Sequence, residues 1–284
     1  MNIFMRFPGG RAKAMTLSYD DGVESDVRLI EIMHKNGLYG TFNVNFGVLA
    51  PEGKVYPAGT VHRRMSRSGI ISAYRDSGME VAIHGFTHPF LDQLPPEIAL
   101  SEVYKDRVAA EEIFGGPIRG MAYPYGTFSD TVVNILKTCG IAYCRTVRPT
   151  RDFRIPEFPL LLDPTCKHLD PALFELLGRF LDKEARHEPQ LFYLWGHTFE
   201  FDRDGNWDLI EKFAETAGGH GDDVWYATNI DIIDYIAAYR SLRWTLDMTR
   251  FTNPTSTEIW LTVGVDGVYR NYTAAPGETV DVTT

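Results

Sequence analysis

Short apolar runs alternate along this chain with segments of helical periodicity, and the alternation limits the fold more than any other feature. The runs predicted as strands are residues 14–22, 39–44, 80–84, 120–126, 141–147, 160–162 (weak), 190–197 and 224–228. Most are apolar at successive positions rather than at alternate ones, which is typical of strands buried on both faces. Such strands, alternating with helices, indicate a parallel sheet covered by helices.

The segments between these strands carry apolar residues at helical spacing. The predicted helices cover residues 27–33, 62–76, 95–114, 129–139, 171–186, 208–216 and 230–239. A β/α barrel is the best match to seven or eight such units. An open doubly wound sheet is the alternative, but no glycine-rich dinucleotide fingerprint follows the first strand.

The character of the chain changes near Leu246. Thr-rich runs at 258–263 and 268–273 read as strands, with turn residues at Asn253-Pro254 and Pro276-Gly277. We therefore predict two parts: residues 1–243 form the β/α barrel, and residues 244–284 form a small antiparallel β appendage.

Composition narrows the class of protein. The 284 residues are 44% hydrophobic and 23% charged, as in ordinary globular proteins, and the net charge is −10. No basic cluster exceeds Arg63-Arg64, which argues against nucleic acid as a partner. No apolar run has the length of a signal peptide or a membrane span, so we expect no membrane partner.

The number and spacing of the cysteines indicate the redox state of the compartment in which the protein is expected. Cys139, Cys144 and Cys166 form no CxxC pair and, being three, cannot all be in intramolecular disulfides. This favours a reducing compartment, and we expect a cytoplasmic protein. A homo-oligomer is left open beside a monomer.

Chemistry-bearing residues gather where the predicted strands end. Because successive side chains on a strand point to opposite faces, adjacent Asp20 and Asp21 cannot do the same job, and a general base beside a metal ligand is the natural division. The alternative is an Asp-Asp-Gly turn that caps the next helix. His84 and His88, four residues apart, add two ligands if the segment curls, although either could equally be a structural histidine. Tyr123, Tyr125, Arg145 and His197 close other strands.

Four motifs together resemble the polysaccharide deacetylase (NodB-homology) family, carbohydrate esterase family four. They are Leu17-Ser-Tyr-Asp20-Asp21-Gly22, His84-Gly-Phe-Thr-His88, Tyr123-Pro-Tyr125-Gly126 and Leu194-Trp-Gly-His197. The resemblance spans about residues 12 to 240 and implies a distorted β/α barrel of about seven strands. It also implies a hydrolase that removes acetyl groups from an acetylated carbohydrate.

The same resemblance implies roles for individual residues. Asp20 would be the general base, and Asp21, His84 and His88 would bind one divalent cation, with zinc expected first and cobalt, nickel or manganese as alternatives. The backbone N–H of Tyr125 would hold the oxyanion, and His197 would be the general acid.

The chain departs from the family pattern at two points, and in each case another residue is predicted to take over the role. The arginine expected two residues before the proline is Ala122 here, and Arg145 is predicted to supply that cation to Asp20; a surface ion pair is the alternative for Arg145. The carboxylate that orients the catalytic histidine is predicted at Asp163, with Glu200 as the alternative. Tyr123, Asp163 and His168 are predicted to line the substrate cleft.

Three functions remain open at this point. The favoured one is a metal-dependent deacetylase acting on an N-acetylated, or less favoured O-acetylated, carbohydrate. A cyclic imide or ureide hydrolase keeps the fold and metal, although relatives of that kind tend to alter the base motif, which is intact here. A carbohydrate-binding pseudoenzyme is the third, motivated by the arginine missing at Ala122.

Overall fold

The computed structural model describes residues 1–182 and 187–283. Its helices are α1 Asp26–Lys35, α2 Arg67–Tyr74, α3 Pro96–Phe114, α4 Asp130–Thr138, α5 Leu173–Asp182, α6 Phe199–Asp204, α7 Trp207–Ala217 and α8 Asn229–Arg240. Its strands are β1 Asn2–Arg6, β2 Lys13–Asp20, β3 Gly40–Val44, β4 Glu80–Ile83, β5 Gly120–Ala122, β6 Tyr143–Arg145, β7 Cys166–Lys167, β8 Gln190–Gly196, β9 Val224–Tyr226, β10 Arg243–Trp244, β11 Arg250–Thr252, β12 Ile259–Val265, β13 Val268–Ala274 and β14 Thr279–Asp281.

A curled parallel sheet forms the centre of the molecule and confirms the predicted distorted β/α barrel. Seven strands follow the order β6, β5, β4, β3, β2, β8, β7, and β9 pairs with the start of β2. All eight residues of β2 and all seven of β8 are buried, as expected for strands covered on both faces. Because every strand runs the same way, the carboxyl ends of the strands share one edge.

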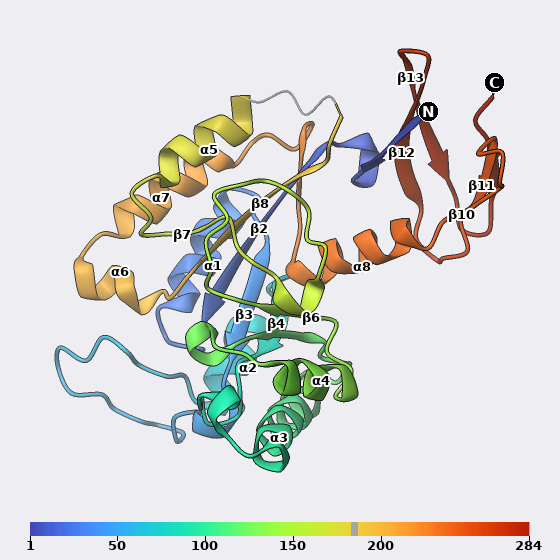
Figure 1. The fold of residues 1–284 in the computed structure, drawn as a ribbon. Coiled ribbons are helices and arrows are strands. Elements are labelled where there is room, and N and C mark those ends of the chain that lie inside the picture. Colours follow the sequence, from blue (N-terminus) through green and yellow to red (C-terminus); the bar gives the residue numbers. More distant parts are fainter. Residues whose placement is uncertain (183–186, 284) are drawn as a thin grey trace.

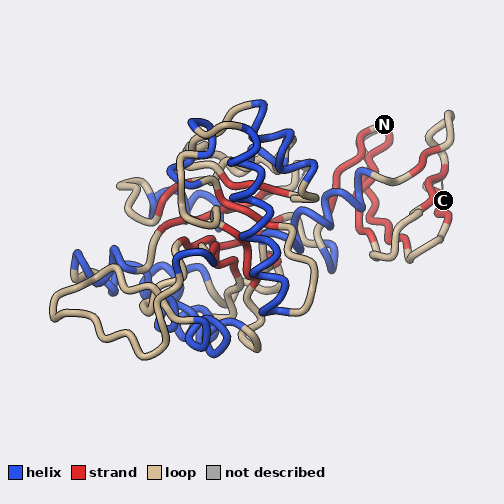
Figure 2. Tube along the Cα trace, turned by 90° about the horizontal axis from the view of Figure 1, so that it is seen from below, coloured by secondary structure: helices blue, strands red, loops and turns tan. Residues whose placement is uncertain are grey.

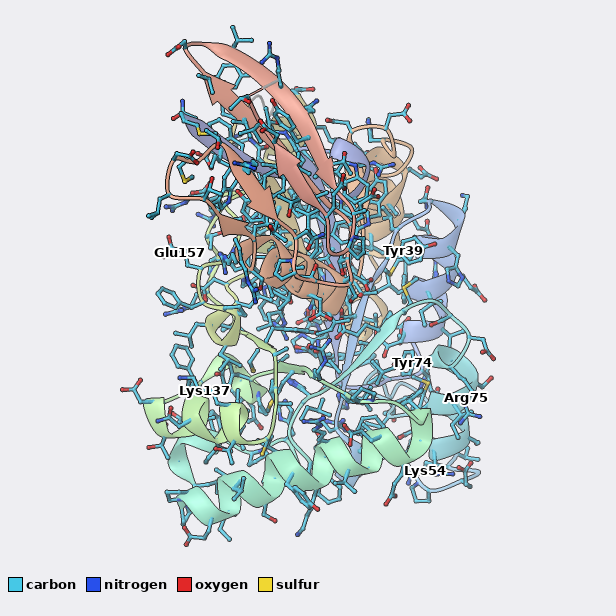
Figure 3. The ribbon with its side chains drawn as sticks, turned by 90° about the vertical axis from the view of Figure 1, so that its right-hand side faces the viewer. Tyr39, Lys54, Tyr74, Arg75, Lys137 and Glu157 are labelled. Carbon is cyan, nitrogen blue, oxygen red and sulfur yellow. The ribbon has the colours of Figure 1, made fainter. Side chains whose placement is uncertain are left out.

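Helices cover the sheet and close its ends (Figure 1). In Figure 1, α5, α6 and α7 lie along one side of β2 and β8, while α2, α3 and α4 gather around the other end of the sheet. Figure 3 shows α3 crossing this end of the domain, with Lys137 of α4 and Lys54 of the loop before α2 to its two sides. None of the described helices combines the length and apolar composition needed to cross a membrane.

Two small antiparallel sheets stand apart from the barrel, beyond α8 (Figure 2). One has the order β1, β12, β13 and the other β10, β11, β14. The first joins the N-terminal strand to the C-terminal region, with Met5 opposite Leu261. Residues 2–6 from the predicted barrel region thus share a sheet with the predicted appendage, and the boundary at residues 243 and 244 stays a prediction.

The described elements depart from prediction in several places, among them the unpredicted β1, β7 and α6. The helix predicted over residues 62–76 begins only at Arg67, because Ser66 caps it by accepting a hydrogen bond from Gly69 N. The weak strand at 160–162 is instead a 3₁₀ turn at Pro159–Leu161, followed by a single bridge between Leu162 and Arg145. The helix predicted over 171–186 is α5, and the end of that prediction, residues 183–186, lies outside the described residues.

Candidate active site

The predicted chemistry-bearing residues lie at the carboxyl ends of neighbouring strands. Asp20 is the last residue of β2, His84 directly follows β4, Arg145 ends β6 and His197 directly follows β8. These strands arrive from distant parts of the sequence, and only the parallel sheet brings them to one edge.

Asp20 is buried and paired with a buried cation. Its Oδ2 lies 2.5 Å from Arg145 Nη2, and its Oδ1 accepts a hydrogen bond from Asn43 Nδ2 at 2.9 Å. The Arg145 guanidinium is fully buried and packs over the Trp195 ring at 4.4 Å. Burial alone would raise the pKa of Asp20, but Arg145, His84 and His197 hold that pKa below its ordinary value. Arg145 therefore stands beside the carboxylate for which it was predicted.

Asp21, His84 and His88 converge on one point. One potential ligand atom from each lies within 4.8 Å of the others. The Nε2 atoms of His84 and His88 are 3.2 Å apart, and His88 Nε2 is 3.9 Å from Asp21 Oδ1. His84 Nδ1 faces the carbonyl oxygen of Ala122 at 2.8 Å, which leaves its Nε2 for the cluster.

The protonation of this cluster suits a cation. Burial lowers the pKa of His84, and burial together with the His84 ring lowers the pKa of His88 to about 4, so both rings are neutral near pH 7. Burial would raise the pKa of Asp21, but a hydrogen bond with His62 and the charges of His84 and Arg64 hold it well below its ordinary value. One carboxylate and two neutral imidazoles form a donor set that fits zinc and similar divalent metals.

The backbone is strained at three site residues. Asp21, His88 and Tyr125 have φ values of 85°, 61° and 58°, in the left-handed region that side chains other than glycine rarely adopt. Such strain costs about 1–3 kcal/mol per residue and persists where the surroundings fix it. The curl that brings His88 toward His84 is thus a left-handed turn at His88, after Gly85 with φ of 77°.

His197 and its carboxylate lie on the other side of Asp20. His197 Nε2 is 3.7 Å from Asp20 Oδ2, and its Nδ1 is 3.5 Å from Glu200 Oε2. Burial would lower the pKa of His197, but Glu200 and then Asp20 raise it above its ordinary value. Glu200 also lies 2.7 Å from Lys167 Nζ and 3.1 Å from His168 Nε2. The carboxylate beside His197 is therefore Glu200, the alternative of the two predicted.

Asp163 lies elsewhere. It accepts hydrogen bonds from the Thr146 hydroxyl and from Arg148 Nε, and it lines a cavity of about 290 Å³ with Phe158. Neither of these partners belongs to the His197 cluster, so the geometry gives Asp163 no contact with the general-acid candidate.

The other predicted substrate contacts differ in exposure. Tyr125 is half exposed, stacks on Phe90 with ring centroids 3.8 Å apart and meets the His88 ring in a T-shaped contact with centroids 4.5 Å apart. Tyr123 is buried and donates a hydrogen bond from its hydroxyl to Leu160 O. His168 is fully buried against Tyr19 and Phe201. Tyr125 is open to a ligand, whereas the side chains of Tyr123 and His168 are covered by protein.

Several residues of the site were not predicted. His62 and Arg64 contact Asp21, although both fell inside a predicted helix. Asp106 of α3 accepts hydrogen bonds from Phe46 N at 2.8 Å and His84 N at 3.0 Å. A buried position within a helical apolar pattern was the available signal for Asp106, but nothing local in the sequence marks its partner.

Comparison with known proteins agrees with this architecture. Residues 8–144 match the family model described as polysaccharide deacetylase. A search of curated protein sequences found no significant match.

Solved structures share the fold at low sequence identity. A putative polysaccharide deacetylase from Mycobacterium smegmatis aligns over 87% of this chain and 98% of its own, with 20% identity and a TM-score of 0.58. The deacetylase PplD of Streptococcus pyogenes, in complex with acetate, aligns over 46% of this chain, with 19% identity and a TM-score of 0.41; the match spans 55% of that protein. A CE4 family pseudoenzyme from Bacillus anthracis aligns over 81% of this chain and 68% of its own, with 16% identity and a TM-score of 0.47.

Only the first of these alignments is close enough to support the fold, and it does so across nearly the whole of that relative. The family match covers the motifs that contain Asp20, Asp21, His84 and His88. Residues 8–144 are therefore similar to the polysaccharide deacetylases, a family of hydrolases.

Proposed function

We propose that this protein is a metal-dependent hydrolase that removes acetyl groups from the nitrogen of an acetylated carbohydrate. The observation that carries the proposal is one cluster in which Asp21, His84 and His88 meet beside the ion pair of Asp20 and Arg145. An acidic residue held ionised next to a ligand set of this kind is the arrangement that metal-assisted hydrolysis needs.

The metal would be held by Asp21, His84 and His88. A divalent ion there would supply Lewis-acid chemistry, lowering the pKa of a water and drawing charge from the acyl carbonyl. Zinc fits the donor set first, with cobalt, nickel and manganese as alternatives.

Two side chains beside the ligands carry out the proton transfers, one as general base and the other as general acid. Asp20, held ionised by Arg145, accepts a proton from the attacking water. His197, whose pKa Glu200 raises, holds a proton at Nε2 on the side of Asp20 and gives it to the departing amine. The backbone N–H of Tyr125 donates to the oxygen on which negative charge develops.

Replacing His84 by Ala tests the metal assignment. Removal of one of three ligands should cost several kcal/mol of site affinity, given apparent zinc binding free energies of about 10 kcal/mol or more. We expect metal analysis of the purified protein to show most of the metal lost in His84→Ala and His88→Ala. His34→Ala is the control, because His34 is exposed on α1 and its ring faces Ser77 O. Metal content unchanged in both ligand variants would contradict the assignment.

Acetate release tests the reaction. The metal-loaded protein should release acetate from N-acetylated chitooligosaccharides faster than from acetylated xylooligosaccharides. Release from the xylooligosaccharides alone would assign an O-deacetylase. Binding of oligosaccharide with metal present and no acetate released from either would support the pseudoenzyme and refute the proposal.

A further inference from the structure

The end of a long loop lies against the turn that contains Asp21. Residues 45–66 connect β3 to α2, and the middle of this segment stands away from the body in Figures 1 and 2. Its last residues return to the turn: Met65 N donates to Gly22 O at 2.9 Å and Glu24 N donates to Arg63 O at 2.8 Å. Backbone hydrogen bonds thus fix residues 62–66 beside the metal-ligand cluster.

Two side chains from residues 62–66, the end of the loop, contact Asp21. His62 Nε2 lies 3.0 Å from Asp21 Oδ2. Arg64 donates from Nη1 to the carbonyl oxygen of Asp21 at 2.9 Å and to Asn45 Oδ1 at 2.8 Å, and its Nη2 lies 3.3 Å from Asp21 Oδ1. Asp21 is the site residue with the largest positive φ among the described non-glycine residues, so these contacts hold a strained backbone in place.

We infer that His62 is a positioning residue for the metal ligand Asp21. Its Nε2–H donates a hydrogen bond to Asp21 Oδ2 and thereby keeps Oδ1 turned toward His88, from which it is 3.9 Å. The inference rests on the proposed function, because it assigns to His62 an effect on the cation that Asp21, His84 and His88 would bind.

The physical reason is the freedom of a carboxylate to rotate. The terminal torsion of an aspartate is broad, so a hydrogen bond to one oxygen selects the orientation that the other oxygen presents. Partners of this kind behind a metal ligand typically change metal affinity by about 10- to 100-fold when they are removed. His62 packs edge-on against Phe199, with ring centroids 4.7 Å apart, and this contact fixes its own ring plane.

Arg64 also contacts Asp21, but replacing Arg64 would test the positioning of Asp21 less clearly than replacing His62. Its hydrogen bonds keep the ligand in place, which favours metal binding, while its positive charge opposes a cation. Replacing Arg64 removes both effects, and they act in opposite directions. At His62, Gln can keep a hydrogen-bond donor while Ala removes it, so the variants are made there.

The experiment measures Co²⁺ binding to the full-length protein by visible absorption, with zinc affinity from competition with a chromophoric chelator. We expect His62→Ala to bind both metals about 10- to 100-fold more weakly than wild type. His62→Gln, whose side-chain amide can donate in place of the imidazole, should recover most of the affinity. Arg63→Gln is the matched control, because Arg63 lies next to His62 in the same loop and pairs with Glu24 at 2.7 Å instead of with Asp21.

The outcomes separate the inference from the function on which it rests. Equal affinities in wild type and His62→Ala would overturn the positioning role and leave the metal site standing. A Co²⁺ band at saturation that differs in shape or intensity between wild type and His62→Ala would also overturn it, since His62 would then be a direct ligand. A wild type that binds neither metal would refute the proposed function itself.

Discussion

Asp20 at the end of β2 and Asp26 at the start of α1 are two buried carboxyl groups, and their surroundings shift their pKa values in opposite directions. Asp20 is 2% exposed and Asp26 is fully buried. Asp20 faces the Arg145 guanidinium, whereas Asp26 accepts hydrogen bonds from three neutral donors, namely the Tyr74 hydroxyl, the Thr198 hydroxyl and Val23 N. Burial raises the pKa of Asp26 to about 7 against those hydrogen bonds, while the pKa of Asp20 is lowered.

The difference shows what distinguishes a carboxylate of the reactive cluster, such as Asp20, from a carboxyl group that supports the structure around it, such as Asp26. Burial penalises both charged forms, and only a nearby cation reverses that penalty. Asp26 instead links the turn after Asp21 to Thr198, which follows His197, and so joins two parts of the site. Asp106 behaves like Asp26: its hydrogen bonds go to Phe46 N and His84 N, and burial raises its pKa to about 8.

The largest expected effect comes from Asp20→Asn. Asn keeps the shape of the side chain but cannot accept the proton, and a general base contributes about 10²- to 10⁴-fold to the rate. We expect kcat to fall by that factor in acetate release while metal analysis shows the metal retained, because Asp21 is intact. Asp208→Asn, on the exposed side of α7, is the control. Near-full activity would show that another group activates the water.

Asp26→Asn should change stability rather than chemistry, through its dependence on pH. A carboxyl whose folded pKa is raised stabilises the protein below its unfolded pKa, and this contribution is lost as pH rises through the folded value. A rise from 3.8 to about 7 corresponds to roughly 4 kcal/mol, at about 1.4 kcal/mol per pKa unit. Asn cannot ionise and should not lose this contribution.

Urea unfolding of wild type and Asp26→Asn between pH 4 and pH 8 checks this prediction. The difference in unfolding free energy should move in favour of the variant as pH rises, most steeply between about pH 4 and 7. Taking the difference between the two proteins removes the contributions of His84, His88 and the other groups that titrate in both. A constant difference across this range would contradict the raised pKa of Asp26.

The fold was predictable because it depends on local patterns that repeat. Most strands of the barrel are short apolar runs that were visible without knowing their neighbours, although β7 was not predicted. The predicted strands at 39–44, 80–84 and 190–197 differ from β3, β4 and β8 by one residue at an end. The resemblance to polysaccharide deacetylases is likewise confirmed, since the family model matches residues 8–144, which contain three of the four motifs.

The partners inside the site were less predictable because they come from residues far apart in the sequence. Arg145 is 125 residues from Asp20, and it was predicted from the cation that the family pattern requires beside the base and from its place at a strand end. His62 was missed because apolar spacing suggested a helix, whereas residues 62–66 pair with the Asp21 turn through their backbone. Between Asp163 and Glu200, the sequence could not show that Glu200 lies on the first turn after β8, three residues beyond His197.

Arg145→Lys sharpens the comparison between the two carboxylates by weakening the cation at Asp20. Lysine keeps the charge but lacks the planar group that reaches Asp20 Oδ2 and Thr146 O and packs on Trp195. We expect activity to fall about 10- to 100-fold with metal retained, within the few kcal/mol that altering a buried charge pair typically costs. The pKa of Asp20 should rise, so the acidic limb of the pH–rate profile should move to higher pH. An unchanged limb would leave Asp20 without its proposed partner; Arg148→Lys, at an exposed pair with Asp163, is the control.

The smallest effect is expected at Glu200, which acts on the reaction only through His197. Glu200 raises the pKa of His197, so Glu200→Gln should lower that pKa. His197 would then lose its proton, and with it the ability to act as general acid, at a lower pH. The alkaline limb of the pH–rate profile should therefore move to lower pH, and kcat should fall above neutrality, where less of His197 is protonated. Because a merely structural role would lower activity equally at all pH values, the movement of the limb is the decisive readout. Glu211→Gln, at the surface pair with Arg28, should leave the profile unchanged. If the limb stays in place while activity falls, Glu200 supports the fold around His168 and Lys167 and does not set the protonation of His197.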